Sequence, residues 1–288
     1  MIISAPASSA NIGPGFDALS IALDVDFLIA LNEQPKGGPW EPANDSHPAI
    51  VAYRDAGGET PMERIWTQAR FPYARGMGFS GASRVAGAYA AFIQNGFDEE
   101  KARDHAFRHA GDLEGHDDNA AASTYGGFCV TTAGHVMRFD CEPESQGLKL
   151  VLFIPEVTTA TDKSRNTLPE SYSKEDLVAS VGNVAMLTAM LASNTFNDEV
   201  LSIATKDVIH QPFRLDDCQP SKMAFAEFQK NGAVAQWLSG SGPSVGAFVK
   251  EEDVSEIIAS IEKLELDCAF SCKEFAVKQD GVQEVTSV

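Results

Sequence analysis

Hydrophobic residues along this chain follow two kinds of pattern, short compact runs and longer stretches with a helical repeat. The short runs are bounded by turn residues and predict strands at 2–4, 27–31, 128–132, 135–139, 149–154, 234–238, 245–249 and 272–277. The longer stretches have apolar residues three and four positions apart and predict helices at 81–94, 99–112, 174–191, 200–209, 221–231 and 253–264. Polar segments at 34–60, 116–127 and 155–169 predict loops.

The order of these elements indicates the fold class. Strands and helices are interleaved in both halves of the chain, but without a regular strand–helix repeat. This arrangement favours an α+β protein of two lobes over a doubly wound parallel sheet. A polar loop begins near Pro155, so we expect an N-terminal domain at residues 1–155 and a C-terminal domain at residues 156–288.

A glycine-rich loop leads directly into the apolar helix predicted from Gly81. Glycine lets a backbone approach a phosphate closely, and the first N–H groups of a helix attract an anion. We therefore predict a nucleotide or phosphate site in this loop, formed by Arg75, Gly76, Met77, Gly78, Phe79, Ser80, Gly81, Ala82 and Ser83.

Other interpretations of the loop stay open at this point. Its glycines also spell G-x-G-x-x-G, with acidic residues at 98–100 near the position of the acidic residue in dinucleotide-binding folds. Against that interpretation, no buried strand run precedes the loop, and no lysine follows the glycines as in a P-loop. A plain loop in which Ser80 or Ser83 caps the helix is the structural alternative.

Composition narrows the range of partners. The chain has 288 residues, of which 41 are acidic and 22 basic, giving a net charge of −19. This acidity argues against nucleic acid and against an anionic membrane surface as partners, because both require a basic face. An acidic protein that binds phosphate must gather its cations locally or use Mg²⁺.

Cysteine spacing and hydropathy bear on location. The five cysteines are odd in number and include no C-x-x-C pair, so neither a disulfide framework nor a zinc site is indicated. The N-terminus has no charged leader, and no 18 apolar residues stand together. We therefore expect a soluble, cytoplasmic protein.

Three further segments carry unusual chemistry. Residues 6–17, PASSANIGPGFD, place an amide and a carboxylate in a tight loop, and residues 114–119, EGHDDN, combine acids, an imidazole and an amide. Residues 237–244, WLSGSGPS, form a second small-residue loop between two predicted strands. Taken singly, each residue could be a turn former, a helix cap or a satisfied loop histidine.

Together, in this order and spacing, the segments resemble the GHMP small-molecule kinases, and within them the homoserine kinases. Residues 6–17 resemble that family's P-A-[ST]-[ST]-A-N-x-G-x-G-F-D opening, and residues 72–83 its phosphate loop. Residues 114–119 resemble its E-G-H-P-D-N segment and residues 238–244 its L-S-G-[AS]-G-P-[ST] loop. Two further stretches, 163–169 and 207–214, agree with an R-x-x-L-P turn and a D-x-[LI]-H-[EQ]-P-[YF]-R motif, so the likeness spans almost the whole chain.

The resemblance implies a fold and an activity. The fold would be the two-lobed GHMP kinase fold, with an N-terminal lobe of mixed sheet and helices and a C-terminal α/β sandwich-like lobe. The activity would be ATP-dependent phosphorylation of the side-chain hydroxyl of L-homoserine, a step of threonine biosynthesis. The cofactors would be ATP and Mg²⁺, the partner a small amino-acid substrate, and a homodimer is a further possibility because dimers are usual among such proteins.

Site residues follow from the same resemblance. Residues 75–83 would bind the ATP phosphates, while Ser80 with Glu114 or Asp112 would bind Mg²⁺. Substrate binding would fall to Asn11, Asp17, His116, Asp118, Arg165, Arg214 and Gly240. The residues closest to the reaction would be Asn119, Arg165 and Ser80, and deprotonation of the hydroxyl would be weak or assisted by the substrate itself.

Two departures from the family pattern leave alternatives open. Phe79 stands where the family usually has serine, which places an aromatic ring in the phosphate loop, and Asp117 replaces the usual proline near the predicted ammonium site. One alternative is a kinase for another small alcohol, which would be favoured if Arg165 and Arg214 do not meet in one pocket. Another is a catalytically inert ligand-binding protein on the same fold.

Overall fold

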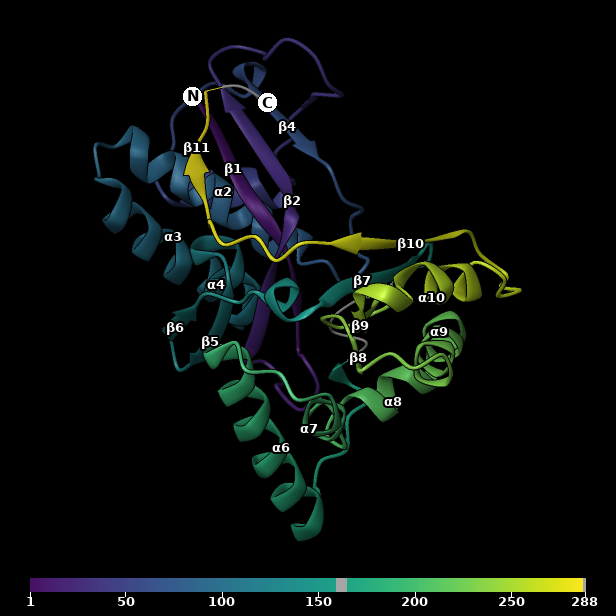
Figure 1. Ribbon diagram of the computed structural model, residues 1–288. Helices are drawn as coiled ribbons and strands as arrows, with labels where there is room; N and C mark the ends of the chain where they lie inside the picture. Colours follow the sequence, from purple (N-terminus) through teal and green to yellow (C-terminus); the bar gives the residue numbers. More distant parts are fainter. Residues whose placement is uncertain (159–164, 287–288) are drawn as a thin grey trace.

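The computed structural model describes residues 1–158 and 165–286, which form two antiparallel sheets covered by helices (Figure 1). The first sheet has the order β11-β1-β2-β4-β3, and β5 joins it through β2 and pairs with β6. Its strands are β1 (Ile2–Ala10), β2 (Leu19–Leu31), β3 (Glu41–Pro42), β4 (Ile65–Ala69), β5 (Phe128–Thr132), β6 (His135–Phe139) and β11 (Gln283–Glu284).

Four helices accompany the first sheet. They are α1 (Pro48–Asp55), α2 (Phe79–Gln94), α3 (Glu99–Glu114) and α4 (Asp118–Tyr125). Helices α2 and α4 contact β1 and β2 directly, while α1 and α3 pack against α2. Small residues on α2, such as Ala86 and Ala90, are fully buried and allow this close approach between the helix and the sheet.

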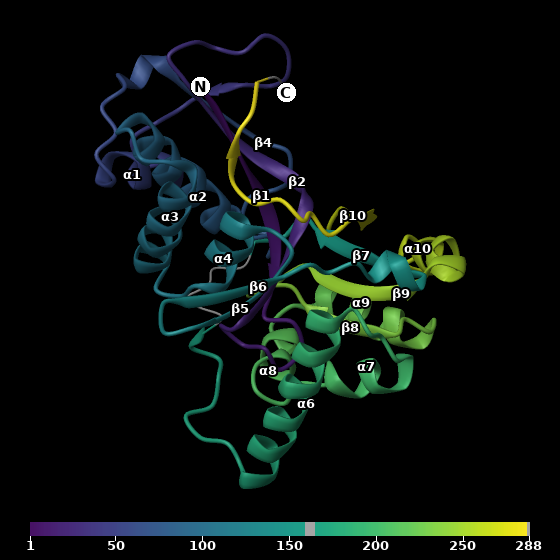
Figure 2. The same cartoon turned by 60° about the vertical axis from the view of Figure 1, so that its left-hand side comes forward.

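The second sheet has the order β10-β7-β9-β8. Its strands are β7 (Leu148–Pro155), β8 (Ala235–Leu238), β9 (Val245–Lys250) and β10 (Phe270–Phe275). The helices of this half are α6 (Lys174–Ser193), α7 (Asp198–Ala204), α8 (Gln211–Asp216), α9 (Gln219–Lys230) and α10 (Val254–Ile261). Helices α9 and α10 contact the strands of this sheet, and Figure 2 shows them beside β8 and β9.

The second sheet links two hydrophobic cores. Alternate side chains of a strand point to opposite faces. On β7, Val151 and Phe153 belong to a core with α9 and α10, whereas Leu150 and Leu152 belong to the large core of the first sheet. Strand β7 therefore joins the lobes through its two faces.

The predicted fold class is confirmed: the structure is α+β, with a helix-covered sheet in each lobe. The division at residue 155 stays a prediction. Strand β7 lies before that point and pairs with β9 and β10 after it, while β11 returns from the C-terminus to pair with β1. In Figure 1, β11 accordingly lies beside β1, near the N-terminus.

Several elements differ from the prediction. The segment 34–60, predicted as a loop, contains β3 and α1, and β4 follows it. The predicted turn at 116–127 contains α4, whose three alanines at 120–122 are fully buried. The two helices become regular because each packs against an apolar surface, α1 on α2 and α4 on β1 and β2, which an isolated short helix lacks.

Helix α6 extends away from both sheets in Figures 1 and 2. Its 20 residues make it long and apolar enough to cross a membrane by length and composition alone, although residues such as Gly182 and Asn183 interrupt a purely apolar run. Only 22% of its most apolar window is buried within the described residues. Leu177, Val178 and Val181 are each at least half exposed, so α6 presents an apolar face to solvent.

Candidate active site

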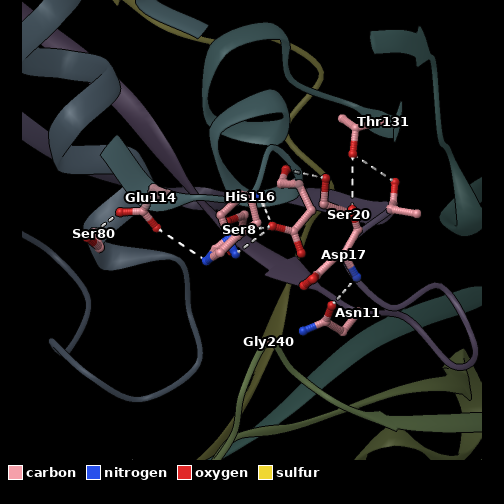
Figure 3. Close-up of polar contacts among 12 residues, drawn as sticks. Ser8, Asn11, Asp17, Ser20, Ser80, Glu114, His116, Thr131 and Gly240 are labelled. Atoms are coloured by element: carbon pink, nitrogen blue, oxygen red, sulfur yellow. Dashed lines mark hydrogen bonds and ion pairs between the residues drawn. The ribbon is translucent and has the colours of Figure 1, made fainter. Parts of the chain in front are cut away.

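A cavity of about 270 Å³ brings together side chains from both halves of the chain. Its lining includes eleven residues outside the phosphate loop, each of which lies in or next to a segment that the sequence singled out. They are Asn11, Asp17, Tyr73, Glu114, His116, Asp118, Asn119, Arg165, Arg214, Gly240 and Ser241. Figure 3 shows how Asn11, Asp17 and His116 lie around this space.

The phosphate loop enters the cavity at the N-terminus of α2. Gly76 and Gly78 have positive φ angles of 72° and 67°, a backbone conformation that favours glycine. A Cβ atom on Gly78 would lie 2.0 Å from the Ser8 hydroxyl oxygen, so a side chain has no room there. No side chain caps the first turn of α2, so its first N–H groups are available to an anion that enters the cavity.

The predicted loop residues are placed differently within this segment. Six of the nine line the cavity: Arg75, Gly76, Gly78, Phe79, Ser80 and Gly81. Met77 is buried, and its carbonyl oxygen accepts a hydrogen bond of 3.1 Å from the Ser8 N–H. Ala82 and Ser83 are buried one turn into α2, outside the lining residues.

The end of β1 and the loop between β8 and β9 hold the phosphate loop in place. The Ser239 hydroxyl donates a 2.6 Å hydrogen bond to the Gly76 carbonyl oxygen and contacts the Ser9 hydroxyl at 2.8 Å. The Gly240 N–H donates to the Ala10 carbonyl oxygen at 2.8 Å. These hydrogen bonds fix the predicted phosphate loop against two segments that are distant in sequence.

Asp118 is the most buried acid in the cavity. Its side chain is 1% exposed, and its Oδ1 accepts from the Asn119 N–H and lies 2.8 Å from His116 Nδ1. Its Oδ2 is buried and has no hydrogen-bond partner. An unpaired buried carboxylate oxygen is costly, so this atom is suited to receive a cationic group of a ligand.

His116 and Asn119 are oriented by the same carboxylate. Burial alone lowers the pKa of His116, but the hydrogen bond and charge of Asp118, with a contribution from Asp17, outweigh it and raise the pKa above its usual value. Asn119 receives a 2.8 Å hydrogen bond at Oδ1 from the Ser8 hydroxyl. Its amide is therefore held in one orientation at the cavity surface.

Two arginines, Arg165 and Arg214, line the same cavity as Asp118 and Asn119. Arg165 donates from both terminal nitrogens to the Asp17 carboxylate, each at 2.8 Å. Arg214 is 4% exposed, and its Nε is buried without a partner. The guanidinium carbons of Arg165 and Arg214 lie 5.5 Å and 4.9 Å from the centre of the Phe16 ring. Both side chains line the same cavity, as the carboxylate-binding prediction requires.

Buried neighbours position Arg214. Its Nη1 lies 3.3 Å from His210 Nδ1, and His210 Nε2 lies 2.9 Å from the Gly13 carbonyl oxygen. Burial lowers the pKa of His210 most strongly, and the charge of Arg214 lowers it further, although Asp207 opposes this effect. A neutral His210 fits beside a guanidinium, where a second positive charge would be repelled.

The two predicted metal ligands Ser80 and Glu114 lie together, whereas Asp112 does not join them. The Ser80 hydroxyl donates to Glu114 Oε1, as Figure 3 shows, and both residues line the cavity. Asp112 is exposed and lies outside the lining residues. One carboxylate and one hydroxyl beside a phosphate site are a fitting oxygen set for Mg²⁺, which usually takes few protein ligands.

The two departures from the family pattern have structural explanations. The Phe79 ring packs edge-on against Phe27, Phe71 and Tyr73, at centroid distances of 5.6 to 6.1 Å. It also lines a second cavity of about 410 Å³ that adjoins the first. Asp117 lies outside the cavity lining and instead accepts a 3.0 Å hydrogen bond from the Gly134 N–H.

Sequence reasoning missed several supporting residues, namely Ser8, Phe16, Arg84 and His210. Ser8 and Phe16 lie inside the opening segment 6–17, and His210 lies inside the motif at 207–214. The segments were therefore identified, but the site roles were predicted for other residues in them. Arg84 lies four positions after Ser80, one turn further along α2, and only this helical spacing pointed to it. Of the motif at 163–169, Lys163 and Ser164 lie outside the described residues.

Comparison with known proteins agrees with this geometry. The family model for the C-terminal part of GHMP kinases matches residues 183–265. The homoserine kinase of Solibacter usitatus is 32% identical over 280 residues, covering 91% of this chain and 90% of that protein. The homoserine kinase of Streptomyces coelicolor is 32% identical over 273 residues, covering 89% and 87%.

Solved structures show the same relationship. The homoserine kinase of Cytophaga hutchinsonii superposes with a TM-score of 0.80 at 25% identity, covering 98% of this chain and 96% of that one. The mevalonate kinase of Methanococcus jannaschii, at 16% identity and a TM-score of 0.68, shares the fold over 96% and 98%. Fold and phosphate loop together define a GHMP-type kinase. Within that class, the extent of identity places the chain in the homoserine kinase family, which confirms the predicted resemblance.

Proposed function

We propose that this protein transfers the γ-phosphoryl group of ATP to the side-chain hydroxyl of L-homoserine, which makes it an enzyme of threonine biosynthesis. Family membership supports the reaction. The observation that carries the assignment to this chain is the meeting of Arg214, Arg165 and the unpaired Asp118 oxygen in the cavity that the phosphate loop enters.

The charges of the cavity match an amino acid with a side-chain alcohol. Arg214, whose Nε has no hydrogen-bond partner, suits the substrate carboxylate, because a guanidinium forms charged hydrogen bonds with a carboxylate. Arg165, which is paired with Asp17, adds a second positive charge beside it. Asp118 Oδ2 suits the ammonium group, with Asp17 and His116 close by. Asn119 then faces the hydroxyl, and Asn11 fixes the loop by accepting a 2.7 Å hydrogen bond from the Asp17 N–H.

The nucleotide would occupy both adjoining cavities. Its phosphates would lie against residues 75–83, where the N-terminus of α2 opens into the first cavity. The base would lie in the second cavity beside His47, Phe79 and Gln68, which offer two rings and an amide. Phe79 separates the two spaces and lines both of them.

The reaction forms one O–P bond and breaks another. The homoserine hydroxyl oxygen attacks the γ-phosphorus while the bond to the β–γ bridging oxygen breaks, and ADP leaves with that electron pair. The hydroxyl proton passes to an oxygen of the transferred phosphoryl group, because the Asn119 amide has no basic site. Positioning and charge neutralisation supply most of the catalysis in such a transfer.

Mg²⁺ would be held by Ser80 and Glu114, where it would neutralise phosphate charge. Of the two acids, only Glu114 lines the cavity, so Glu114 is the candidate ligand in preference to Asp112. The phosphates would lie beside this metal, at the first N–H groups of α2, because Ser80 belongs to the first turn of that helix.

The test is Mg-ATP-dependent ADP release by the purified protein with L-homoserine, L-serine, L-threonine, mevalonate, galactose or no acceptor. We expect turnover with homoserine, and in Arg214→Met a loss of kcat/KM of about 100-fold, the value of a lost charged hydrogen-bond pair. Arg108→Met is the matched control, because Arg108 is exposed on α3. Turnover only with another alcohol would assign a different substrate, and tight Mg-ATP binding without any turnover would indicate an inert binding protein.

Location and association complete the proposal. We propose a cytoplasmic enzyme without nucleic-acid or membrane partners, supported by the net charge of −19. We also propose a homodimer that pairs the apolar face of α6, formed by Leu177, Val178 and Val181, with that of a second copy. Residues 177–193 carry no charge, so two acidic chains can meet there without repulsion at the contact.

A further inference from the structure

Arg84 occupies an unusual place behind the predicted metal site. Its guanidinium forms an ion pair with Glu114 and donates a hydrogen bond from Nη1 to the Ser80 hydroxyl oxygen. The Ser80 hydroxyl in turn donates to Glu114 Oε1. Arg84, Ser80 and Glu114 therefore form a closed triangle, in which both candidate metal ligands already contact a positive charge.

The triangle is shielded from solvent. The Glu114 side chain is 7% exposed and that of Arg84 23% exposed, and Arg84 Nε is buried without a partner. Arg84 is absent from the residues that line the cavity, whereas Ser80 and Glu114 line it. The guanidinium thus approaches the two ligands from the protein side and leaves their cavity side open.

Glu114 requires such a partner. It is the last residue of α3, where the partial negative charge of the helix C-terminus disfavours a carboxylate, and the last turn of α3 has no basic residue. Among the described residues, the His116 imidazole is the other ionisable partner of Glu114, with Nε2 3.8 Å from Oε2, and it is positively charged only when protonated. Arg84, at Oε1, is the permanently charged one.

We propose that Arg84 is a positioning residue of the metal site, which holds Ser80 and Glu114 together and keeps a divalent cation from binding there until nucleotide phosphates are present. The inference rests on the proposed nucleotide site. A cation that approaches Glu114 from the cavity meets the repulsion of the guanidinium at a distance of a few ångströms. Phosphates reverse the balance, because they add several negative charges on the cavity side and complete the oxygen shell.

The geometry leaves coordination capacity for that state. Glu114 lines the cavity, and the Ser80 oxygen keeps one lone pair after donating to Glu114 and accepting from Arg84. Arg84 can therefore remain in place when the metal arrives with the nucleotide. The positive charge of Arg84, which lies against Glu114, then also offsets part of the negative charge of the phosphates.

The experiment measures Mn²⁺ binding to the nucleotide-free protein by electron paramagnetic resonance, with Glu114→Gln defining the part of the signal that belongs to this site. We expect Arg84→Met to bind Mn²⁺ at the Glu114-dependent site about 10- to 100-fold more tightly than wild type, because the repulsion is removed. Arg84→Lys should stay close to wild type. Arg108→Met, which removes one exposed charge, should not change the affinity.

Two results would overturn the proposal: Arg84→Met binding Mn²⁺ no more tightly than wild type, or a gain of the same size in Arg108→Met. Should Arg84→Met fail to fold, wild type decides. We expect its Glu114-dependent Mn²⁺ site to strengthen at least about tenfold when a non-hydrolysable ATP analogue is added. Equal Mn²⁺ affinity with and without the bound analogue would contradict the proposal. Absence of analogue binding would refute the proposed function instead. In that case the nucleotide-free protein still decides the role of Arg84, because Arg84→Lys should bind Mn²⁺ like wild type and Arg84→Gln should bind it more tightly.

Discussion

Asp118 Oδ2 is a buried carboxylate oxygen that has no hydrogen-bond partner, and its side chain lines the cavity. It belongs to a side chain that is 1% exposed, and its other oxygen already contacts His116 and the Asn119 N–H. Replacing the buried carboxylate by an amide keeps the shape but removes the charge that an ammonium group would pair with.

We therefore expect Asp118→Asn to raise the KM for homoserine about 10- to 100-fold with a smaller change in kcat, because a charged hydrogen bond contributes about 1.5 to 3 kcal/mol. Steady-state kinetics measure this. Asp117→Asn is the matched control, since Asp117 bonds to Gly134 outside the cavity. An unchanged KM in Asp118→Asn would place the ammonium group elsewhere.

His210 is a second residue with a clear expectation, here for stability. Its pKa in the folded protein is lowered by burial, so the unfolded chain binds a proton more readily. The unfolded state therefore carries more protons as the pH falls below about 6.5, and the free energy of unfolding decreases with falling pH until the folded-state pKa is reached.

We expect the free energy of unfolding of wild type to decrease between pH 7 and pH 5 more steeply than that of His210→Gln, by up to about 1.4 kcal/mol per pH unit. Glutamine can keep a hydrogen bond to the Gly13 carbonyl oxygen, which His210 contacts at 2.9 Å. Urea unfolding at a series of pH values gives the comparison. Parallel pH profiles for the two proteins would show that His210 does not titrate differently in the folded state.

At the scale of elements, the start of α2 is a tightly constrained junction. Gly78 has a φ of 67° and caps the helix, and a Cβ there would lie 2.0 Å from Ser8 Oγ and 2.8 Å from Asn119 Oδ1. Gly96 has a similar φ of 84°, but a Cβ there meets nothing within 4 Å. Comparing substitutions at Gly78 and Gly96 therefore separates the cost of a left-handed backbone from the cost of a steric clash.

We expect Gly96→Ala to lose about 1 to 2 kcal/mol of unfolding free energy from the left-handed backbone alone. Gly78→Ala should lose more than this and should also weaken ATP binding, because the loop must move away from Ser8 and Asn119. Thermal unfolding and calorimetric ATP titration measure the two effects. Equal losses of stability with unchanged ATP affinity would show that the loop tolerates a side chain.

At the scale of the whole molecule, α6 is the helix with four exposed large apolar side chains, Leu177, Val178, Val181 and Met186. Val178 and Val181 are 65% and 67% exposed, although a capping box of Ser173 and Asp176 shows that its first turn is well formed. An exposed apolar helix on an acidic protein is a typical association surface.

We expect the purified protein to sediment as a dimer and the double variant Val178→Glu with Val181→Glu to sediment as a monomer, because two added charges per chain would repel across the contact. Glu175→Gln with Asp176→Gln is a comparison that lowers charge on the same helix. A wild-type monomer, or a variant that remains dimeric, would contradict the assignment of α6.

The sequence by itself determined the fold class, most of the long elements and the segments of the candidate site. These features depend on local chemistry: apolar periodicity for α2 and α3, and glycines at 76 and 78 where a positive φ is required. The family resemblance then ordered the segments around a common reaction, and the comparisons bear it out.

Only the tertiary structure decided the rest. Helix α4 forms because Ala120, Ala121 and Ala122 find a buried surface beside β1 and β2, which no local pattern reveals. Strand β11 pairs with β1 across almost the whole length of the chain. In the same way, the closed contact of Arg84 with Ser80 and Glu114 joins α2 to the end of α3, because packing sets the distance between two helices and sequence spacing alone does not.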